Sequence, residues 1–255
     1  MNPLLELGPY FFSVPMIFFG VQYFRYGFMG GLPPVPPWAR GGALGAYLTG
    51  ALLILAGASI LIGKKARWGA ALIAGLFLFC VIVLFSPRMN DMVHSGTERT
   101  RALEPLALSG AAFALISLLP GDRTISSRLT HTSDWLTRTG RWLFALCMIV
   151  FGYQHFLYAQ FIATLVTSWI PAHQFWVYFT GVGMIVAALA ILVEKGGRLA
   201  ATWLGIMFLL WVIVLHAPRV AARHSKDEWN SAFVALAFSG ASFIVARTLP
   251  RDTSS

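Results

Sequence analysis

The chain contains an internal repeat, in which residues 16–119 return in altered form at residues 148–249. Three pairs of motifs set the register between the copies, at offsets of 132, 131 and 130 residues: MIFFGVQYF at 16–24 and MIVFGYQHF at 148–156, YLTG at 47–50 and YFTG at 178–181, and LSGAAF at 108–113 and FSGASF at 238–243. Such a duplication predicts two copies of one structural unit, with any functional site where the copies meet.

Composition indicates the solvent in which these two units fold. Hydrophobic residues make up 57% of the chain and charged residues only 11%, whereas a soluble domain has roughly 25% charged residues. We therefore expect an integral membrane protein whose main partner is the lipid bilayer. The net charge of +9 comes from basic residues placed singly or in pairs at the ends of apolar runs. This pattern indicates membrane topology and argues against nucleic acid as a partner.

Each copy has four apolar stretches close to the roughly 20 residues that a membrane-spanning helix needs. They lie at 11–28, 43–63, 68–86 and 101–119 in the first copy, and at 141–161, 174–193, 199–217 and 231–249 in the second. The predicted fold is all-α, with eight transmembrane helices in two four-helix bundles. Because four is an even number, both copies enter the membrane in the same direction, and a pseudo-twofold axis should run along the membrane normal.

The predicted organisation is a first repeat at 1–121, a polar connector at 122–140 and a second repeat with a short polar tail at 141–255. Eleven of the 19 Lys and Arg residues fall on the side of the termini and the connector, and eight fall on the other side, called the outer side below. Basic residues are enriched in cytoplasmic loops, so this count favours cytoplasmic termini. Cys80 and Cys147 both lie inside apolar runs and indicate neither a disulfide nor a redox pair.

The same motifs occur in the same order in both copies: a first span ending in Gly-x-x-polar-Phe, a loop with Pro and Trp, a Gly-rich second span and a basic turn. The segments that carry it are GVQYF (20–24), Pro33 to Trp38, YLTG (47–50) and KKAR (64–67), then GYQHF (152–156), Trp169 to Pro171, YFTG (178–181) and KGGR (195–198). This order resembles the DoxX-like family of bacterial membrane proteins. The chain departs from the usual member by carrying two units, and by Tyr23 and His155 where many members have a basic residue.

The resemblance implies a four-helix unit, a bacterial inner membrane, and association with a redox or sulfur-handling assembly. It transfers no catalytic residue. The partners that follow from it are a redox enzyme or a second copy of the chain. The cofactor stays open, with a quinone as the candidate.

Polar residues near the spans are the candidate site residues, because hydrocarbon makes them costly. Gln22 and Gln154 occupy equivalent positions near the outer ends of their helices. Either these amides hydrogen-bond a quinone carbonyl or a lipid headgroup, or they form interhelical hydrogen bonds, which we favour. His155 and His216 occur only in the second copy, both toward the outer side. They form a metal, proton or haem site if they face each other, and are otherwise hydrogen-bonded interfacial histidines.

The motif His-Ser-x-x-Glu occurs in both copies, with the residues His94, Ser95, Glu98 and His224, Ser225, Glu228. A twofold axis that brought both motifs together would make a metal site from two histidines and two glutamates. Ser-x-x-Glu directly before an apolar helix is also the capping box, in which Ser bonds the N3 amide and Glu reaches back to the cap. We favour the capping interpretation.

Arg88 and Arg219 each follow a proline at matched positions on the outer side. They either clamp an anionic group there or lie against helix C-termini and lipid phosphates. Three functions fit the sequence. The favoured one is a structural or accessory subunit of a membrane redox assembly, since no nucleophile, thiol pair or complete metal motif is present. The alternatives are a quinone-linked oxidoreductase component and a small-molecule or lipid transporter.

Overall fold

The computed structural model describes residues 3–27, 31–32, 43–85, 89–120 and 130–251, which are helical apart from turns and short loops. Long apolar runs separated by short polar turns account for this all-α fold. The helices are α1 Pro3–Glu6, α2 Gly8–Tyr26, α3 Ala43–Ile62, α4 Ala66–Phe85, α5 Met89–His94, α6 Gly96–Leu118, α7 Thr130–Leu157, α8 Ala159–Leu165, α9 His173–Val193, α10 Gly197–Trp211, the π-helix η5 Val212–His216, α11 Ala217–Arg223 and α12 Lys226–Thr248.

Within the described residues, seven helical segments are long and apolar enough to cross a membrane: 3–26, 43–62, 66–83, 96–118, 173–193, 197–223 and 226–248. An eighth span results when α7 and α8 are counted together. The chain is therefore an all-helical integral membrane protein, and this part of the sequence prediction is confirmed.

The fifth span differs at both ends from the stretch predicted at 141–161. α7 begins at Thr130, inside the predicted connector, and ends at Leu157, where the chain turns by 94° into α8. Neither proline nor glycine stands at the corner, which is formed by Tyr158. The Tyr158 hydroxyl accepts a hydrogen bond of 3.0 Å from Arg99 Nη2. The corner is thus tied to the first turn of α6 by a contact between residues far apart in the sequence.

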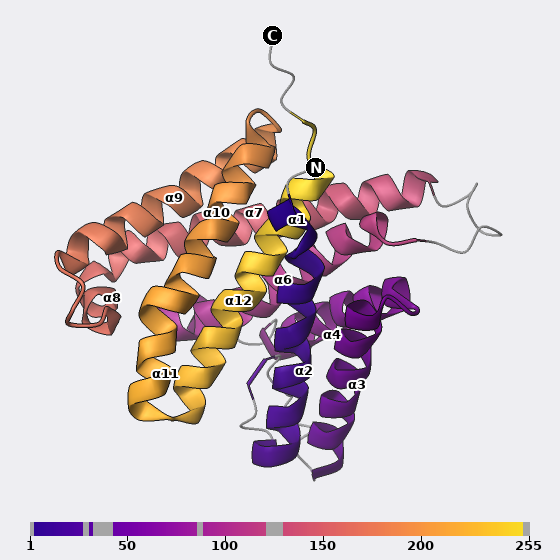
Figure 1. The fold of residues 1–255 in the computed structure, drawn as a ribbon, viewed down its shortest axis with the longest axis horizontal. Helices are drawn as coiled ribbons and strands as arrows, with labels where there is room; N and C mark the ends of the chain where they lie inside the picture. The colour runs from indigo at the N-terminus through magenta and orange to yellow at the C-terminus, as the bar shows by residue number, and fades with distance from the viewer. Residues whose placement is uncertain (1–2, 28–30, 33–42, 86–88, 121–129, 252–255) are drawn as a thin grey trace.

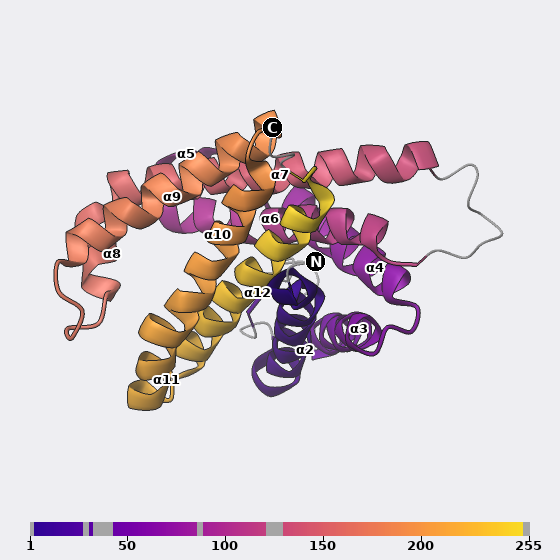
Figure 2. The same ribbon diagram turned by 45° about the horizontal axis from the view of Figure 1, so that its top comes forward.

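The helices of the two halves pack in the same order. In the first half α2 packs against α3, α3 against α4 and α4 against α6; in the second, α7 packs against α9, α9 against α10 and α10 against α12. Between the halves, α6 packs against α7, α12 packs against α2, and α6 contacts α12. Both views place α2 beside α3 and α10 beside α12 (Figures 1 and 2). One hydrophobic core runs through both halves.

Glycines allow the first two long helices of each half to approach closely. A Cβ atom on Gly20 would lie 2.6 Å from the Gly50 carbonyl oxygen, and one on Gly152 would lie 2.6 Å from the Gly181 oxygen. Neither contact leaves room for a side chain, so small residues determine these helix pairs. Two serine hydroxyls also donate across helices at matched positions: Ser109 Oγ to Ala74 O and Ser239 Oγ to Gly205 O, each at 2.8 Å.

The end of the bundle that carries α1 and the last turn of α12 is held by polar contacts (Figure 1). Arg141 Nη2 lies 2.7 Å from Glu194 Oε1, and Arg141 Nη1 donates to the Thr248 carbonyl at 2.9 Å. Arg247 Nη1 lies 3.1 Å from Glu6 Oε2. These contacts join α7, the end of α9, α12 and α1. The candidate site described next lies at the opposite end of the bundle, where α6 and α12 begin.

Candidate functional site

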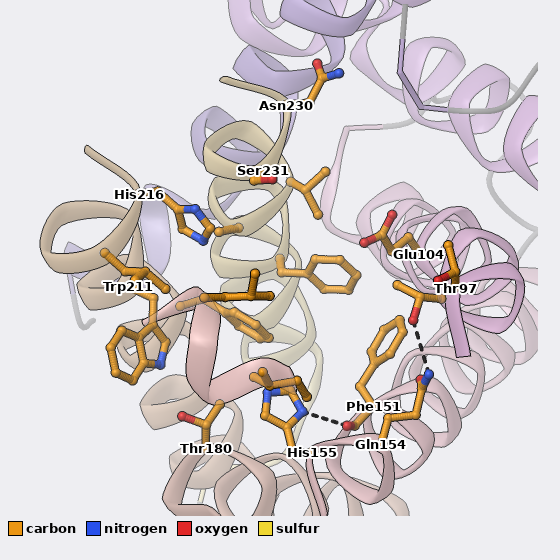
Figure 3. A pocket seen from close by; sticks show the side chains of 18 of the residues that line it. Thr97, Glu104, Phe151, Gln154, His155, Thr180, Trp211, His216, Asn230 and Ser231 are labelled. Carbon is orange, nitrogen blue, oxygen red and sulfur yellow. Dashed lines mark hydrogen bonds between the residues drawn. The ribbon is translucent and has the colours of Figure 1, made fainter. Parts of the chain in front are cut away.

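A pocket of about 1130 Å³ lies at the end of the bundle where α6 and α12 begin. Its walls come from the starts of α6, α9 and α12, the ends of α7 and α10, α8 and the π-helix η5. Phe19, Gly31 and Leu32 also line it. Figure 3 shows side chains from these elements turned toward a common space. Small-molecule pockets usually measure about 300–1,000 Å³. The space is therefore large enough for such a ligand.

Aromatic rings form much of the pocket wall. The ring centroids of Phe208 and Phe238 lie 5.4 Å apart, and those of Phe151 and Phe238 lie 5.8 Å apart. Trp176 and Trp211 meet edge to face at 6.0 Å. Aromatic contacts at these separations fix ring orientation and give a rigid apolar surface. This wall suits the hydrophobic part of an amphipathic molecule.

Charged side chains also line the pocket, and most of them are paired. Arg101 Nη1 lies 2.9 Å from Glu98 Oε1, and Lys226 Nζ lies 3.9 Å from Asp227 Oδ1. Glu104 follows one turn after Arg101 and also lines the pocket. Within the part of the chain that the structure describes, no hydrogen bond or ion pair joins the Glu104 carboxylate. The paired charges thus leave one carboxylate facing the pocket.

Glu104 is placed by α6 well inside the bundle. It lies eight residues after Gly96, where α6 begins, which is about 12 Å at roughly 1.5 Å per residue. Its neighbours on the helix, Ala102 and Pro105, are buried. Figure 3 shows the Glu104 carboxylate turned toward the middle of the pocket, with His216 on the opposite side of the view. An acid at this depth is a functional candidate by itself.

The two candidate glutamines are both buried, but only Gln154 lines the pocket. Gln154 Nε2 donates to Gly96 O at 3.1 Å and contacts Thr100 Oγ1 at 3.2 Å. Because a carbonyl can only accept, these contacts orient the amide and leave its oxygen, Gln154 Oε1, buried without a partner among the described residues. Gln22 Nε2 lies 3.5 Å from Asn230 Oδ1 on α12. Both glutamines therefore join helices, and Gln154 lines the pocket with its amide oxygen buried and unpartnered in the described residues.

The two candidate histidines both line the pocket, on different walls. His155 Nδ1 lies 2.8 Å from the Phe151 carbonyl, so Nδ1 carries the hydrogen and donates, and Nε2 of a neutral ring accepts. His216 ends the π-helical turn η5, and its Nδ1 is buried with no hydrogen-bond partner in the described residues. π-Turns inside α-helices often occur at functional sites. The structure thus brings His155, His216 and Gln154 to one pocket.

The His-Ser-x-x-Glu motifs begin α6 and α12. Ser95 Oγ accepts from Glu98 N and Ser225 Oγ accepts from Glu228 N, each at 3.3 Å. Ser95 N donates to Asp91 O at 2.8 Å. Glu98 instead pairs with Arg101, and Glu228 pairs with arginines of α11. The serine caps are present, while both glutamates form ion pairs.

His94 and His224 are exposed and do not line the pocket. His94 Nδ1 lies 2.9 Å from Asn90 O within its own helix, and His224 has a left-handed backbone with φ of 48° between α11 and α12. Within the described ranges, no group of three or more His, Cys, Asp or Glu side chains is placed to hold a metal ion. The metal interpretation of the repeated motif has no support in this geometry.

Arg219 is held by the chain's own carboxylate. Its Nε lies 2.8 Å from Glu228 Oε2, its Nη2 donates to Glu228 Oε1 at 2.9 Å, and its Nη1 donates to Leu165 O at 2.7 Å. Arg223 Nη1 also lies 2.8 Å from Glu228 Oε1. Arg219 is therefore engaged and does not offer its charge to an anionic ligand. The matched Arg88 lies outside the described residues.

The sequence analysis missed Glu104, although a signal was present. An acidic residue inside an apolar run of membrane-spanning length is energetically costly, and its presence therefore indicates a functional residue. Trp211 and Asn230 were also missed, because a tryptophan inside an apolar run and an asparagine near the start of a helix carry no signal of a pocket.

One family model matches part of the chain. The family is described as "Domain of unknown function (DUF8561)", and the match covers residues 144–237. This stretch runs from α7 into α12 and includes Gln154, His155 and His216, while Glu104 lies before it. Comparisons with curated proteins and with solved structures found no match. The chain is thus similar, over its second half, to a family whose function is not described.

Proposed function

We propose that this membrane protein binds a small amphipathic molecule in the pocket between α6, α7, α8, α9, α10 and α12. The observation that carries the proposal is the pocket itself, about 1130 Å³ in volume, with aromatic walls and a few polar groups. Concave sites with mainly apolar walls and convergent polar groups are typical of ligand binding. An accessory subunit that only docks an enzyme needs no such space, so small-molecule binding becomes the leading function.

The internal repeat and the distribution of basic residues together indicate on which side of the membrane the pocket opens. We infer two related four-helix units, because the glycine pairs, the serine hydrogen bonds and the order of helix packing recur in both halves. The starts of α6 and α12 lie on the side with fewer basic residues. With cytoplasmic termini in a bacterial inner membrane, the pocket would open near the outer leaflet.

The resemblance to DoxX-like proteins makes a quinone one candidate occupant. Gln154, His155 and His216 line the pocket and are the polar side chains that would hydrogen-bond a quinone, and the aromatic wall would pack against its ring. Association with a redox enzyme or with a second copy of the chain stays a prediction. A transporter role would use the same pocket together with the bend at Tyr158 and the π-turn η5.

Native mass spectrometry of the protein, gently extracted from its own membrane, tests the proposal. We expect a non-covalent small-molecule adduct, which is then released and identified. The variant Val234→Trp places a large side chain in the pocket and should abolish the adduct, since Val234 lines the pocket. The matched control Val186→Trp makes the same change at an exposed position of α9 and should keep it.

A wild-type chain that carries only bilayer phospholipid, unchanged by Val234→Trp, would overturn the proposal. Copurification of a partner protein in that case would return the accessory role to first place.

A further inference from the structure

Three polar side chains of the pocket have an acceptor atom with no hydrogen-bond partner in the described residues. Glu104 presents a carboxylate with no hydrogen bond or ion pair in the described residues. The Gln154 amide oxygen is buried without a partner, because the amide nitrogen makes the hydrogen bonds to Gly96 and Thr100. His155 in its neutral form presents Nε2 as an acceptor, since Nδ1 donates to a backbone carbonyl. A ligand that satisfies these three groups must supply donors.

The charges near the pocket lead to the same class of ligand. Arg101 pairs with Glu98 and Lys226 with Asp227, so the cations that line the pocket already have anionic neighbours. The Arg101 charge also acts on Glu104 from one helical turn away, but no hydrogen bond or ion pair joins Glu104 in the described residues. A carboxylate against an apolar wall is costly unless a cation or donor pairs with it. A cationic group in the pocket would remove this cost.

The aromatic wall adds a second reason for a cation. Phe151, Phe208, Phe238, Trp176 and Trp211 all line the pocket. The faces of such rings attract cations, most strongly for tryptophan and in desolvated sites. The same rings bury the apolar part of a ligand. A carboxylate, an imidazole acceptor and aromatic side chains in one pocket therefore favour the same kind of molecule.

We propose that the pocket selects amphipathic ammonium compounds, with the ammonium group paired to Glu104. This inference rests on the proposed small-molecule binding and names the chemical class of the ligand. The ligand's aromatic or aliphatic body lies against the phenylalanines and tryptophans of the wall.

Isothermal titration calorimetry in lipid nanodiscs tests the inference with three probes that share one ring system. These are 2-(1-naphthyl)ethylammonium, 2-(1-naphthyl)ethanol and 1-naphthylacetate, which present a cation, a neutral hydroxyl and an anion. Nanodiscs without protein measure the partition of each probe into lipid. The Val234→Trp variant measures protein binding outside the pocket.

We expect the ammonium probe to bind at least about tenfold more tightly than the alcohol, the factor expected for a charge-assisted hydrogen bond. The carboxylate probe should bind weakest. Glu104→Gln keeps the size of the side chain and removes its charge, so it should bring the ammonium and alcohol probes to similar affinity. Asp134→Asn removes one acidic charge at an exposed position of α7 outside the pocket and should change neither affinity.

The outcomes separate this inference from the proposed function. If the alcohol or the carboxylate binds as tightly as the ammonium probe, and Val234→Trp abolishes that binding, the preference for cations is wrong and the pocket still binds small molecules. If no probe shows binding that Val234→Trp removes, both proposals fail. The comparison of headgroups uses the wild-type protein, so it decides the question even if Glu104→Gln does not fold.

Discussion

The outer ends of the two halves differ although their helices pack in the same order. In the first half, Tyr23 and Phe77 are fully buried, and the Tyr23 hydroxyl donates to Gly31 O at 3.2 Å. At the matched positions of the second half, His155 is partly exposed and Phe208 is 8% exposed, and both line the pocket. In the part of the chain that the structure describes, Tyr23 is enclosed by its neighbours, whereas His155 borders a pocket.

This difference shows how a duplicated unit can acquire a site in one copy. Tyrosine is larger than histidine, and in the first half it fills the position that His155 occupies in the second. The backbone contacts that hold the helices, such as Gly20 against Gly50 and Gly152 against Gly181, do not depend on this exchange. A few side chains can thus change an end of the bundle from packed to open while the helix arrangement persists.

The largest expected effect distinguishes the two glutamates of the repeated motif. Glu228 is buried between Arg219 and Arg223, with 6% of its side chain exposed. We expect Glu228→Gln to lower the free energy of unfolding by about 3 kcal/mol, because it leaves the largely buried Arg219 without its charge partner. Unfolding by SDS in mixed micelles measures this loss.

Glu98 is the matched control, since it pairs with an Arg101 side chain that is 63% exposed. Glu98→Gln should cost less than about 1 kcal/mol, as usual for exposed ion pairs. Equal losses for the two variants would contradict the structural difference between these ion pairs.

The next effect tests whether the two halves share one helix packing. Gly20→Ala and Gly152→Ala each place a Cβ atom 2.6 Å from a facing carbonyl oxygen. Each should lower the free energy of unfolding by about 2 kcal/mol through overpacking. Thermal unfolding followed by a thiol-reactive dye reports it, because Cys80 and Cys147 are buried in the folded state.

Gly75→Ala is the control for the glycine variants, since a Cβ atom there meets no atom within 4 Å. It should be neutral or slightly stabilising, by about 0.5 kcal/mol, because alanine favours the helix. A loss at only one of Gly20 and Gly152 would mean that the halves do not pack alike.

Exchanging the residues that differ tests the comparison directly. Tyr23→His removes a fully buried ring and its hydrogen bond to Gly31, so we expect a loss of about 2 kcal/mol. His155→Tyr fills part of the pocket, should change stability by less than about 1 kcal/mol, and should abolish the small-molecule adduct in native mass spectrometry. A large destabilisation by His155→Tyr would mean that the space beside His155 cannot accept a tyrosine.

The smallest effect concerns the paired glutamines. Gln154→Leu removes contacts to Gly96 and Thr100, and should cost about 1 kcal/mol. Gln22→Leu removes only the long 3.5 Å contact to Asn230, and should cost about 0.5 kcal/mol. SDS unfolding of both variants ranks them, and a larger loss at Gln22 would reverse the ranking that the distances predict.

Most of the fold could be predicted from the sequence, because the length and apolarity of a span are properties of one contiguous segment. The seven long helices and the bent eighth agree with the apolar runs. The 94° turn at Tyr158 could not be predicted, since no proline or glycine marks it and its contact to Arg99 joins residues distant in sequence. The π-turn before Ala217 does have a local signal, because Pro218 lacks the N–H that would continue the α-helical hydrogen bonds.

The candidate site was predicted in part. Gln154, His155 and His216 were singled out as polar residues near the outer side, and all three line the pocket. For Arg219 the sequence left two interpretations, an anion clamp or a position against a helix C-terminus and lipid phosphates, and neither included the ion pair with Glu228. That pairing depends on how α11 and α12 meet, which the sequence pattern does not state.

The sequence by itself determined that the chain is helical and apolar enough for a membrane, and which small residues recur where helices approach, because these features are local and repeated. Only the tertiary structure decided that the pocket lies between the start of α6 in the first half and helices of the second half, and that Glu104 faces it. A pocket is the volume left between side chains of several helices, so its position and polarity depend on residues that meet only after folding.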